Sequence, residues 1–126
     1  MLVNRIIAGT VRENITFGLP YDPERYNEAI AACALDVDIS KLQDGDLTEI
    51  GERGINLSGG QKARLALACA AYSRASVMLL DDPLSAVDPN VGRTLFTKCI
   101  GPNGIMRHGP TPHYCEHLPT LNDTFF

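Results

Sequence analysis

Apolar side chains recur at helical spacing in two long segments of the chain. Asp22 can cap a helix that begins at Pro23, where the missing N–H of proline would be unpaired in any case. Its apolar stripe, at positions i, i+3, i+4 and i+7, consists of Tyr26, Ala29, Ile30 and Cys33. The second segment is rich in Ala and Leu, which predicts a helix from Gln61 to Ala75.

The rest of the pattern predicts shorter elements. Residues 10–18 form a short extended or turn segment that ends at Gly18, and Asp38 is expected to cap a short helix that continues to Leu42. A last helix is predicted from Pro89 to Ile100, with Asp88 as its cap.

One short apolar run has the pattern of a buried parallel strand. Residues 77–80 are Val-Met-Leu-Leu, and Asp81-Asp82-Pro83 stops the run. A buried parallel strand of this kind is typical of an α/β fold. We expect the strand to lie in the middle of a sheet whose other strands are missing here, which would leave backbone groups open and the fold marginally stable.

Residues 108–126 differ from the rest of the chain. They contain three Pro, all three His and no Lys or Arg, and they show no helical or strand period. We therefore expect residues 1–107 to form the folded part and residues 108–126 to be a disordered or poorly packed tail.

Composition and charge exclude few classes of function. The chain has 126 residues, of which 44% are hydrophobic and 21% charged, as in ordinary soluble domains. A formal net charge of −4 gives no electrostatic reason to expect nucleic acid as a partner. No apolar run approaches the roughly 20 residues that span a bilayer. The four cysteines contain no C-x-x-C pair and are interpreted as buried, reduced thiols: Cys33, Cys69, Cys99 and Cys115.

Candidate chemistry begins at Leu57-Ser58-Gly59-Gly60-Gln61, which opens the most helical stretch. The first N–H groups of a helix have no intrahelical partner, and glycine lets a phosphate approach the backbone closely, so this start can bind an anion. Taken alone, the same sequence is equally well explained as a flexible helix cap.

Two carboxylates follow the predicted strand. Asp81 lies where parallel strands place ligands and can hold a hydrated Mg²⁺ next to phosphates. Asp82 could orient or deprotonate an attacking water. Taken alone, Asp-Asp-Pro is equally well explained as a turn that ends the strand.

In order and spacing, the segment from Thr48 through the signature Leu57–Gln61 to Asp88 resembles the ABC ATPase domain, including its signature, Walker B strand and D-loop. The resemblance covers roughly residues 5–107. It implies a partial P-loop NTPase fold, mainly the helical subdomain with the Walker B strand and the following helix.

The resemblance also implies roles for individual residues. Ser58, Gly59 and Gly60 would contact the γ-phosphate of an ATP that is held mainly by a second cassette. Asp81 would bind Mg²⁺, and Asp82 stands where active members of the family carry a catalytic Glu. The D-loop, which touches the partner cassette, would include Ser85, Ala86 and Asp88.

The sequence departs from the family in three places. It has no G-x-x-x-x-G-K-[ST] loop, no Gln near residues 2–4 where the Q-loop is expected, and no apolar strand before a switch His. His113 and His117 are poor candidates for that switch. A zinc site is an alternative use of part of the tail, through His108, His113, Cys115 and His117. We expect a fragment or frame-shifted product of a larger domain, or else a short protein that evolved from one.

The resemblance is nearest to the first nucleotide-binding domain of multidrug-resistance-associated (C-type) exporters, in which Asp replaces the catalytic Glu. It implies ATP and Mg²⁺ as cofactors, a second ABC ATPase domain and transmembrane domains as partners, and a place on the cytoplasmic side of a membrane. The alternatives are a non-catalytic fragment that only binds a partner cassette, and a soluble ABC ATPase of DNA repair or translation.

Overall fold

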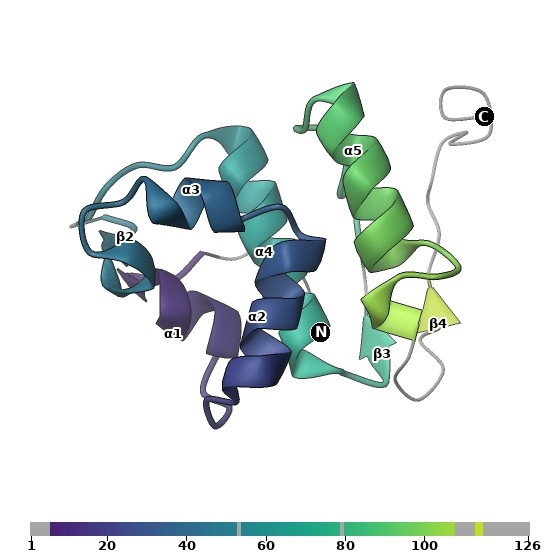
Figure 1. The fold of residues 1–126 in the computed structure, drawn as a ribbon, viewed down its shortest axis with the longest axis horizontal. Helices are drawn as coiled ribbons and strands as arrows, with labels where there is room; N and C mark the ends of the chain where they lie inside the picture. The colour runs from purple at the N-terminus through teal and green to yellow at the C-terminus, as the bar shows by residue number, and fades with distance from the viewer. Residues whose placement is uncertain (1–5, 53, 79, 108–112, 115–126) are drawn as a thin grey trace.

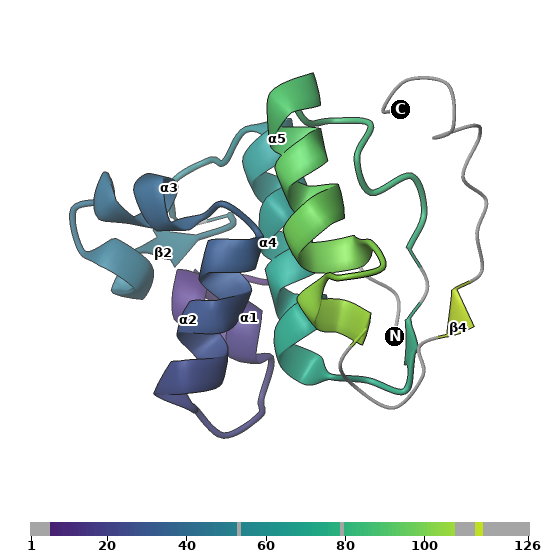
Figure 2. The same ribbon diagram turned by 45° about the vertical axis from the view of Figure 1, so that its right-hand side comes forward.

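The computed structural model describes residues 6–52, 54–78, 80–107 and 113–114, with the helix α4 (Gly59–Ser73) at their centre. Figure 1 shows α1, α2 and α3 on one side of α4 and α5 on the other, and in Figure 2 α4 and α5 run side by side. The other helices are α1 (Val11–Thr16), α2 (Pro23–Ala32), α3 (Asp36–Ser40) and α5 (Pro89–Leu95). Three short turns complete the helical part: η1 (Gly45–Leu47), η2 (Phe96–Ile100) and η3 (Ile105–Arg107).

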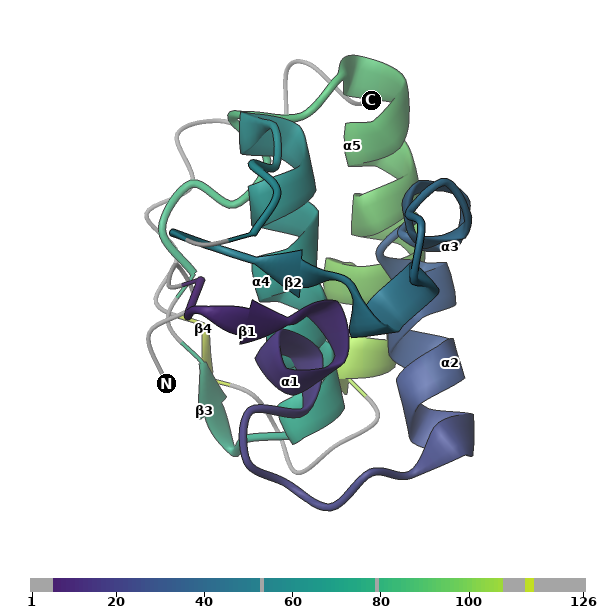
Figure 3. The same ribbon diagram turned by 90° about the vertical axis from the view of Figure 1, so that its left-hand side faces the viewer.

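Strands are short in the described part of the chain. β1 (Gly9–Thr10) pairs antiparallel with β2 (Glu49–Ile50), and in Figure 3 both strands lie in front of the helices. β3 (Val77–Met78) pairs parallel with β4 (His113–Tyr114). The predicted strand at 77–80 is therefore parallel but shorter than expected. It also has a neighbour, which the sequence analysis did not foresee.

The core forms around the second half of α4 because this part of the helix is buried on every side. All eight residues from Leu65 to Tyr72 are buried, and four of them are alanines. A small side chain lets neighbouring helices approach closely, so α4 can contact α1 and α2 at once. The predicted helix at 61–75 is thus confirmed, although it begins and ends two residues earlier.

Tyr72 ties the loop before α2 to the end of α4. Its hydroxyl donates to the carbonyl of Pro20 and accepts from the backbone N–H of Asp22, at 2.9 Å. Asp22 then caps α2 by accepting from two backbone N–H groups, as predicted. The stripe of Tyr26, Ala29, Ile30 and Cys33 is buried, as its spacing predicted.

Residues 11–16 are helical, so the expectation of an extended or turn segment at 10–18 was wrong. Thr10 Oγ1 accepts from the N–H of Glu13 at 3.1 Å, and Glu13 accepts from the N–H of Thr10 at 2.8 Å. This reciprocal pair is a capping box. Buried Asn14 adds hydrogen bonds to the backbone of Ile7 and Thr10, which fasten the preceding strand to α1.

Asp38 does not cap α3, which corrects the second local prediction. The helix begins at Asp36 without a side-chain cap, and Asp38 lies within it with its carboxylate turned to α4. At the other end of the chain, Asp88 caps α5 as predicted, but the α-helix ends at Leu95 and continues as the π turn η2 to Ile100.

Three cysteines lie in the described part, and all are buried and free, as predicted. Cys33 Sγ and Cys99 Sγ are 3.6 Å apart, and the hydrogen bond between them, together with burial, raises the pKa of Cys33 well above its ordinary value. Burial raises the pKa of Cys69 to about 11. Cys115 lies outside the described residues. Within these residues no helix has the length and apolar character needed to cross a membrane.

We predict that Tyr72→Phe lowers the free energy of unfolding of the full chain by about 1–3 kcal/mol, because it leaves the N–H of Asp22 and the carbonyl of Pro20 without their partner. Urea denaturation measures the change. Tyr21→Phe is the matched control, because Tyr21 is 45% exposed and the substitution removes the same atom. Equal midpoints for the two variants would contradict the anchoring role of Tyr72.

Candidate functional site

The predicted signature, Leu57–Gln61, forms the start of α4. Ser58 is the cap of the helix, and its Oγ accepts from the N–H of Gln61 at 3.2 Å. The side-chain oxygen of Gln61 accepts in return from the N–H of Ser58 at 2.9 Å. The N–H groups of Gly59 and Gly60 lie in the first turn, where helix geometry supplies no acceptor. An anion can therefore bind to this helix start.

The predicted D-loop packs directly against these glycines. A Cβ added to Gly60 would lie 3.1 Å from the carbonyl oxygen of Ala86. One added to Gly59 would meet only the Cβ of Ala86, at 3.9 Å. The second glycine is therefore the one that allows the close approach, and it holds the D-loop next to the signature.

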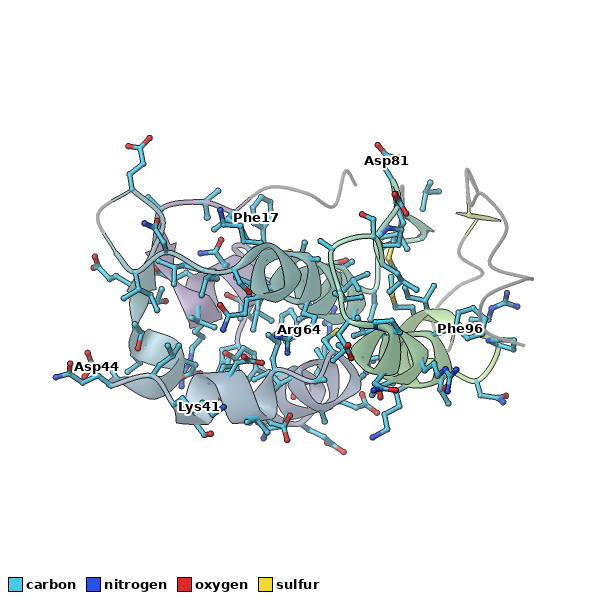
Figure 4. The ribbon with its side chains drawn as sticks, turned by 90° about the horizontal axis from the view of Figure 1, so that it is seen from above. Phe17, Lys41, Asp44, Arg64, Asp81 and Phe96 are labelled. Atoms are coloured by element: carbon cyan, nitrogen blue, oxygen red, sulfur yellow. The ribbon has the colours of Figure 1, made fainter. Side chains whose placement is uncertain are left out.

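The two predicted Walker B carboxylates lie on a loop that leaves the helical body. Figure 4 shows Asp81 at the outer end of this loop, pointing away from the helices. Asp81 and Asp82 are both exposed. Asp82 has a φ of 43°, in the left-handed region that Asp tolerates better than most residues. Its carbonyl accepts from the N–H and hydroxyl of Ser85, which closes the turn into the D-loop.

These segments meet around one open cavity of about 420 Å³. Its wall contains Gly59 from the signature, both carboxylates and two D-loop residues, so the structure brings half of the ten predicted site residues together here. The residues that line it include Gly59, Lys62, Asp81, Asp82, Ser85 and Ala86.

The other five predicted site residues do not line this cavity. Ser58 and Gly60 flank Gly59 at the start of α4. Asp88 caps α5 by accepting from the N–H groups of Asn90 and Val91. Leu57 and Gln61 instead line a small cavity of about 20 Å³ between α1, α3 and α4. Neither residue lines the cavity of about 420 Å³, and Leu57 also lines a separate open cavity of about 550 Å³.

The residues present fit part of a Mg²⁺–ATP site. Mg²⁺ needs few protein ligands, commonly one or two carboxylates together with phosphate oxygens and water, and Asp81 and Asp82 can supply them. The helix start at Ser58 can face a phosphate. Among the described residues no group of three or more His, Cys, Asp or Glu could hold a metal ion alone. Of the alternative zinc ligands, His108, Cys115 and His117 lie outside those residues.

Sequence reasoning missed Lys62, Asp38 and Arg64. Lys62 adds the one cationic side chain among the residues that line the larger cavity. Asp38 accepts hydrogen bonds from Gln61 and Arg64, and both partners lie more than twenty positions away in sequence. A local pattern carries no signal for such contacts.

Comparison with known proteins gives one family. The family model described as "ABC transporter" matches residues 4–85. Multidrug resistance protein mrp-7 of Caenorhabditis elegans is 63% identical over 98 residues, which cover 78% of this chain and 6% of that protein. ATP-binding cassette sub-family C member 2 of Homo sapiens is 54% identical over 119 residues, covering 91% of this chain and 8% of that protein.

A plant relative gives the same picture. ABC transporter C family member 9 of Arabidopsis thaliana is 50% identical over 120 residues, which cover 93% of this chain and 8% of that protein. The chain thus spans less than a tenth of each of these three relatives. The division of the chain at residue 107 stays a prediction.

We predict that Gly60→Ala is less stable than Gly59→Ala by about 1 kcal/mol, the lower end of the cost of overpacking. Both substitutions add the same methyl group and the same helix propensity to one turn, but only the first meets a backbone oxygen at 3.1 Å. Urea denaturation of the two variants side by side measures the difference. Equal stability would show that the D-loop does not rest on Gly60 in solution.

Proposed function

The chain belongs to the ABC transporter family, and we propose that it supplies the signature, Walker B and D-loop part of an ATPase cassette in a C-type membrane exporter. The observation that carries this proposal is the exposure of two predicted nucleotide-facing segments, the helix start at Ser58 and Gly59 and the loop with Asp81 and Asp82, joined by the approach of Ala86 to Gly60. The cassette would couple ATP hydrolysis to transport by the parent protein.

The signature acts on an ATP that a second cassette holds. The N–H groups of Gly59 and Gly60 and the hydroxyl of Ser58 donate to the γ-phosphate, and the positive end of the α4 dipole favours its charge. Ser58 Oγ already accepts from the N–H of Gln61, so its own proton remains available for donation. Ser58 and Gly59 are exposed, as contact with a nucleotide from another domain requires.

The Walker carboxylates act on the nucleotide of their own cassette. Asp81 helps to hold Mg²⁺, which neutralises the β- and γ-phosphates, and Asp82 orients the attacking water. Phosphoryl transfer depends mainly on positioning and charge stabilisation, so the reach of Asp82 sets the rate at this site. Asp is one methylene shorter than the Glu of active cassettes, and the site therefore holds ATP and turns it over slowly.

The partners of the cassette are the second ABC ATPase domain and the transmembrane domains of the parent transporter, at the cytoplasmic face of the membrane. Ser85, Ala86 and Asp88 form the D-loop that meets the second cassette. Exposure of Ser85, Ala86 and Asp88 supports this contact. The same exposed surface supports the second candidate function, a non-catalytic chain that only binds a partner cassette.

We predict that the 126-residue chain alone binds Mg²⁺–ATP more weakly than micromolar. The phosphate-cradling loop G-x-x-x-x-G-K-[ST] does not occur in its sequence, and the signature supplies only the second half of a composite site. Isothermal titration calorimetry at 25 °C tests this. A micromolar dissociation constant, about −8 kcal/mol of binding free energy, would show that the chain contains a complete site.

We predict that Asp82→Glu, in the parent transporter with both cassettes, raises single-turnover hydrolysis at this site at least about tenfold, or ~1.4 kcal/mol of barrier. The added methylene extends the carboxylate by about 1.5 Å, one C–C bond, and a misplacement of about 1 Å can cost on the order of 100-fold. Geometry dominates because the reference pKa values of Asp and Glu differ by only ~0.4.

Two further variants complete this test. Asp36→Glu is the matched control, because Asp36 is an exposed Asp on α3, away from the cavity, and its extension should leave the rate unchanged. Asp81→Asn should weaken the dependence on Mg²⁺ and abolish turnover. An unchanged rate after Asp82→Glu would remove the reason for calling this site slow.

A further inference from the structure

The amide of Gln61 has a polar partner on each side. Its Oε1 accepts from the N–H of Ser58 at 2.9 Å, and its Nε2 donates to Asp38 Oδ1 at 3.1 Å. A carboxylate can only accept, so Asp38 fixes which end of the amide faces it. The opposite end, the oxygen, must then face Ser58, where an acceptor is needed.

Asp38 is itself held in place by a cation. Arg64 Nη1 donates to Asp38 Oδ2 at 2.5 Å and to the carbonyl of Ala34 at 2.6 Å, and Arg64 Nε donates to the carbonyl of Gly60 at 3.3 Å. The side chains of Arg64 and Asp38 are only 14% and 24% exposed. In Figure 4, Arg64 lies between α4 and the neighbouring helices. Burial raises the pKa of Asp38, but hydrogen bonds from Arg64 and Gln61 outweigh it, so the pKa lies below its ordinary value and the group stays ionised.

We propose that Asp38 is a positioning residue for the signature, because its carboxylate orients the amide of Gln61 and so holds Ser58 in the capping box. Both oxygens of Asp38 are used as acceptors, one for Gln61 and one for Arg64. The inference rests on the proposed function, in which Ser58 and the two glycines contact the γ-phosphate of an ATP on the second cassette.

This arrangement predicts a specific failure for Asp38→Asn. The introduced amide has one acceptor, and Arg64, which is charged and always a donor, takes it. The introduced NH₂ then faces Nε2 of Gln61, donor against donor. The Gln61 amide turns over to relieve this contact and presents its own NH₂ to the N–H of Ser58, which breaks the capping box.

The same chemistry predicts a rescue by Gln61→Glu. In the double variant the carboxylate introduced at position 61 accepts both from the amide introduced at position 38 and from the N–H of Ser58. The capping box is restored in its Ser-x-x-Glu form. Gln61→Glu alone places a second carboxylate against Asp38 and should disturb the box. Each single change is therefore harmful, and the pair together is not.

Amide hydrogen exchange of Ser58, measured by NMR on the full chain, tests the positioning step. We expect exchange at least about fivefold faster in Asp38→Asn and in Gln61→Glu, and within about twofold of the unsubstituted chain in the double variant. Asp46→Asn is the matched control, since Asp46 accepts from Arg12 Nε at 2.8 Å and from its Nη2 at 3.2 Å, remote from the signature. Exchange at Ser58 should not change in that variant.

Unchanged exchange in Asp38→Asn, or no recovery in the double variant, would overturn the proposal.

Turnover in the parent transporter with both cassettes tests the functional step. Asp38→Asn should lower kcat at the composite site about tenfold with little change in KM, because the other cassette binds most of the ATP, and the double variant should recover kcat. Ser58→Arg should abolish turnover at the same site. If Ser58→Arg has no effect, the proposed function itself fails. If Ser58→Arg abolishes turnover and Asp38→Asn does not lower it, the proposed function stands and the positioning role of Asp38 is overturned.

Discussion

Burial of the second half of α4 is the constraint on which the other described elements depend. The eight buried residues from Leu65 to Tyr72 leave no solvated face there, so this half of the helix must be covered on all sides. The surrounding helices pack on it, and the loop that carries Asp81 and the D-loop lies against its first turn. The first turn of α4 is then held in a fixed position, because the helix cannot shift without exposing the core.

Alanine packing alone would leave the rotation of α4 loosely specified. An alanine has no side-chain rotamer and a nearly smooth surface, so one turn of the helix resembles the next. Directional contacts at the two ends remove this ambiguity. Tyr72 binds the loop before α2 near the last turn, and Gln61 and Arg64 bind α3 in the first two turns. A hydrogen bond fails within about 1 Å of displacement, whereas an apolar contact tolerates it, so these few polar groups set the register.

The sequence predicts those parts of the fold in which the deciding contact is local. Asp22 with Pro23 and Asp88 with Pro89 mark helix starts that the structure confirms. The same local logic applied to Thr10 and Glu13 would have identified α1, but the segment contains β-branched residues and is short, and the capping box was overlooked. Asp38 was misassigned for a different reason. Its partners on α4 lie far along the chain, and an Asp near a helix start resembles a cap when those partners are unknown.

In the candidate site, too, local features were predictable from sequence and contacts between distant residues were not. The signature and the Walker carboxylates were predicted from sequence through family resemblance and stay predictions, whereas the cavity that Gly59, Asp81 and Asp82 line depends on the turn at Asp82 and the approach of Ala86 to Gly60. The charges around this cavity have a further consequence. The cavity is lined by two negative side chains, Asp81 and Asp82, and by one positive side chain, Lys62. A triphosphate without a metal ion would therefore be repelled by the net negative charge. A divalent cation reverses that balance, and a further lysine and backbone N–H groups are needed to bind the phosphates themselves. The local electrostatics of this cavity therefore favour Mg²⁺ first and an anion second.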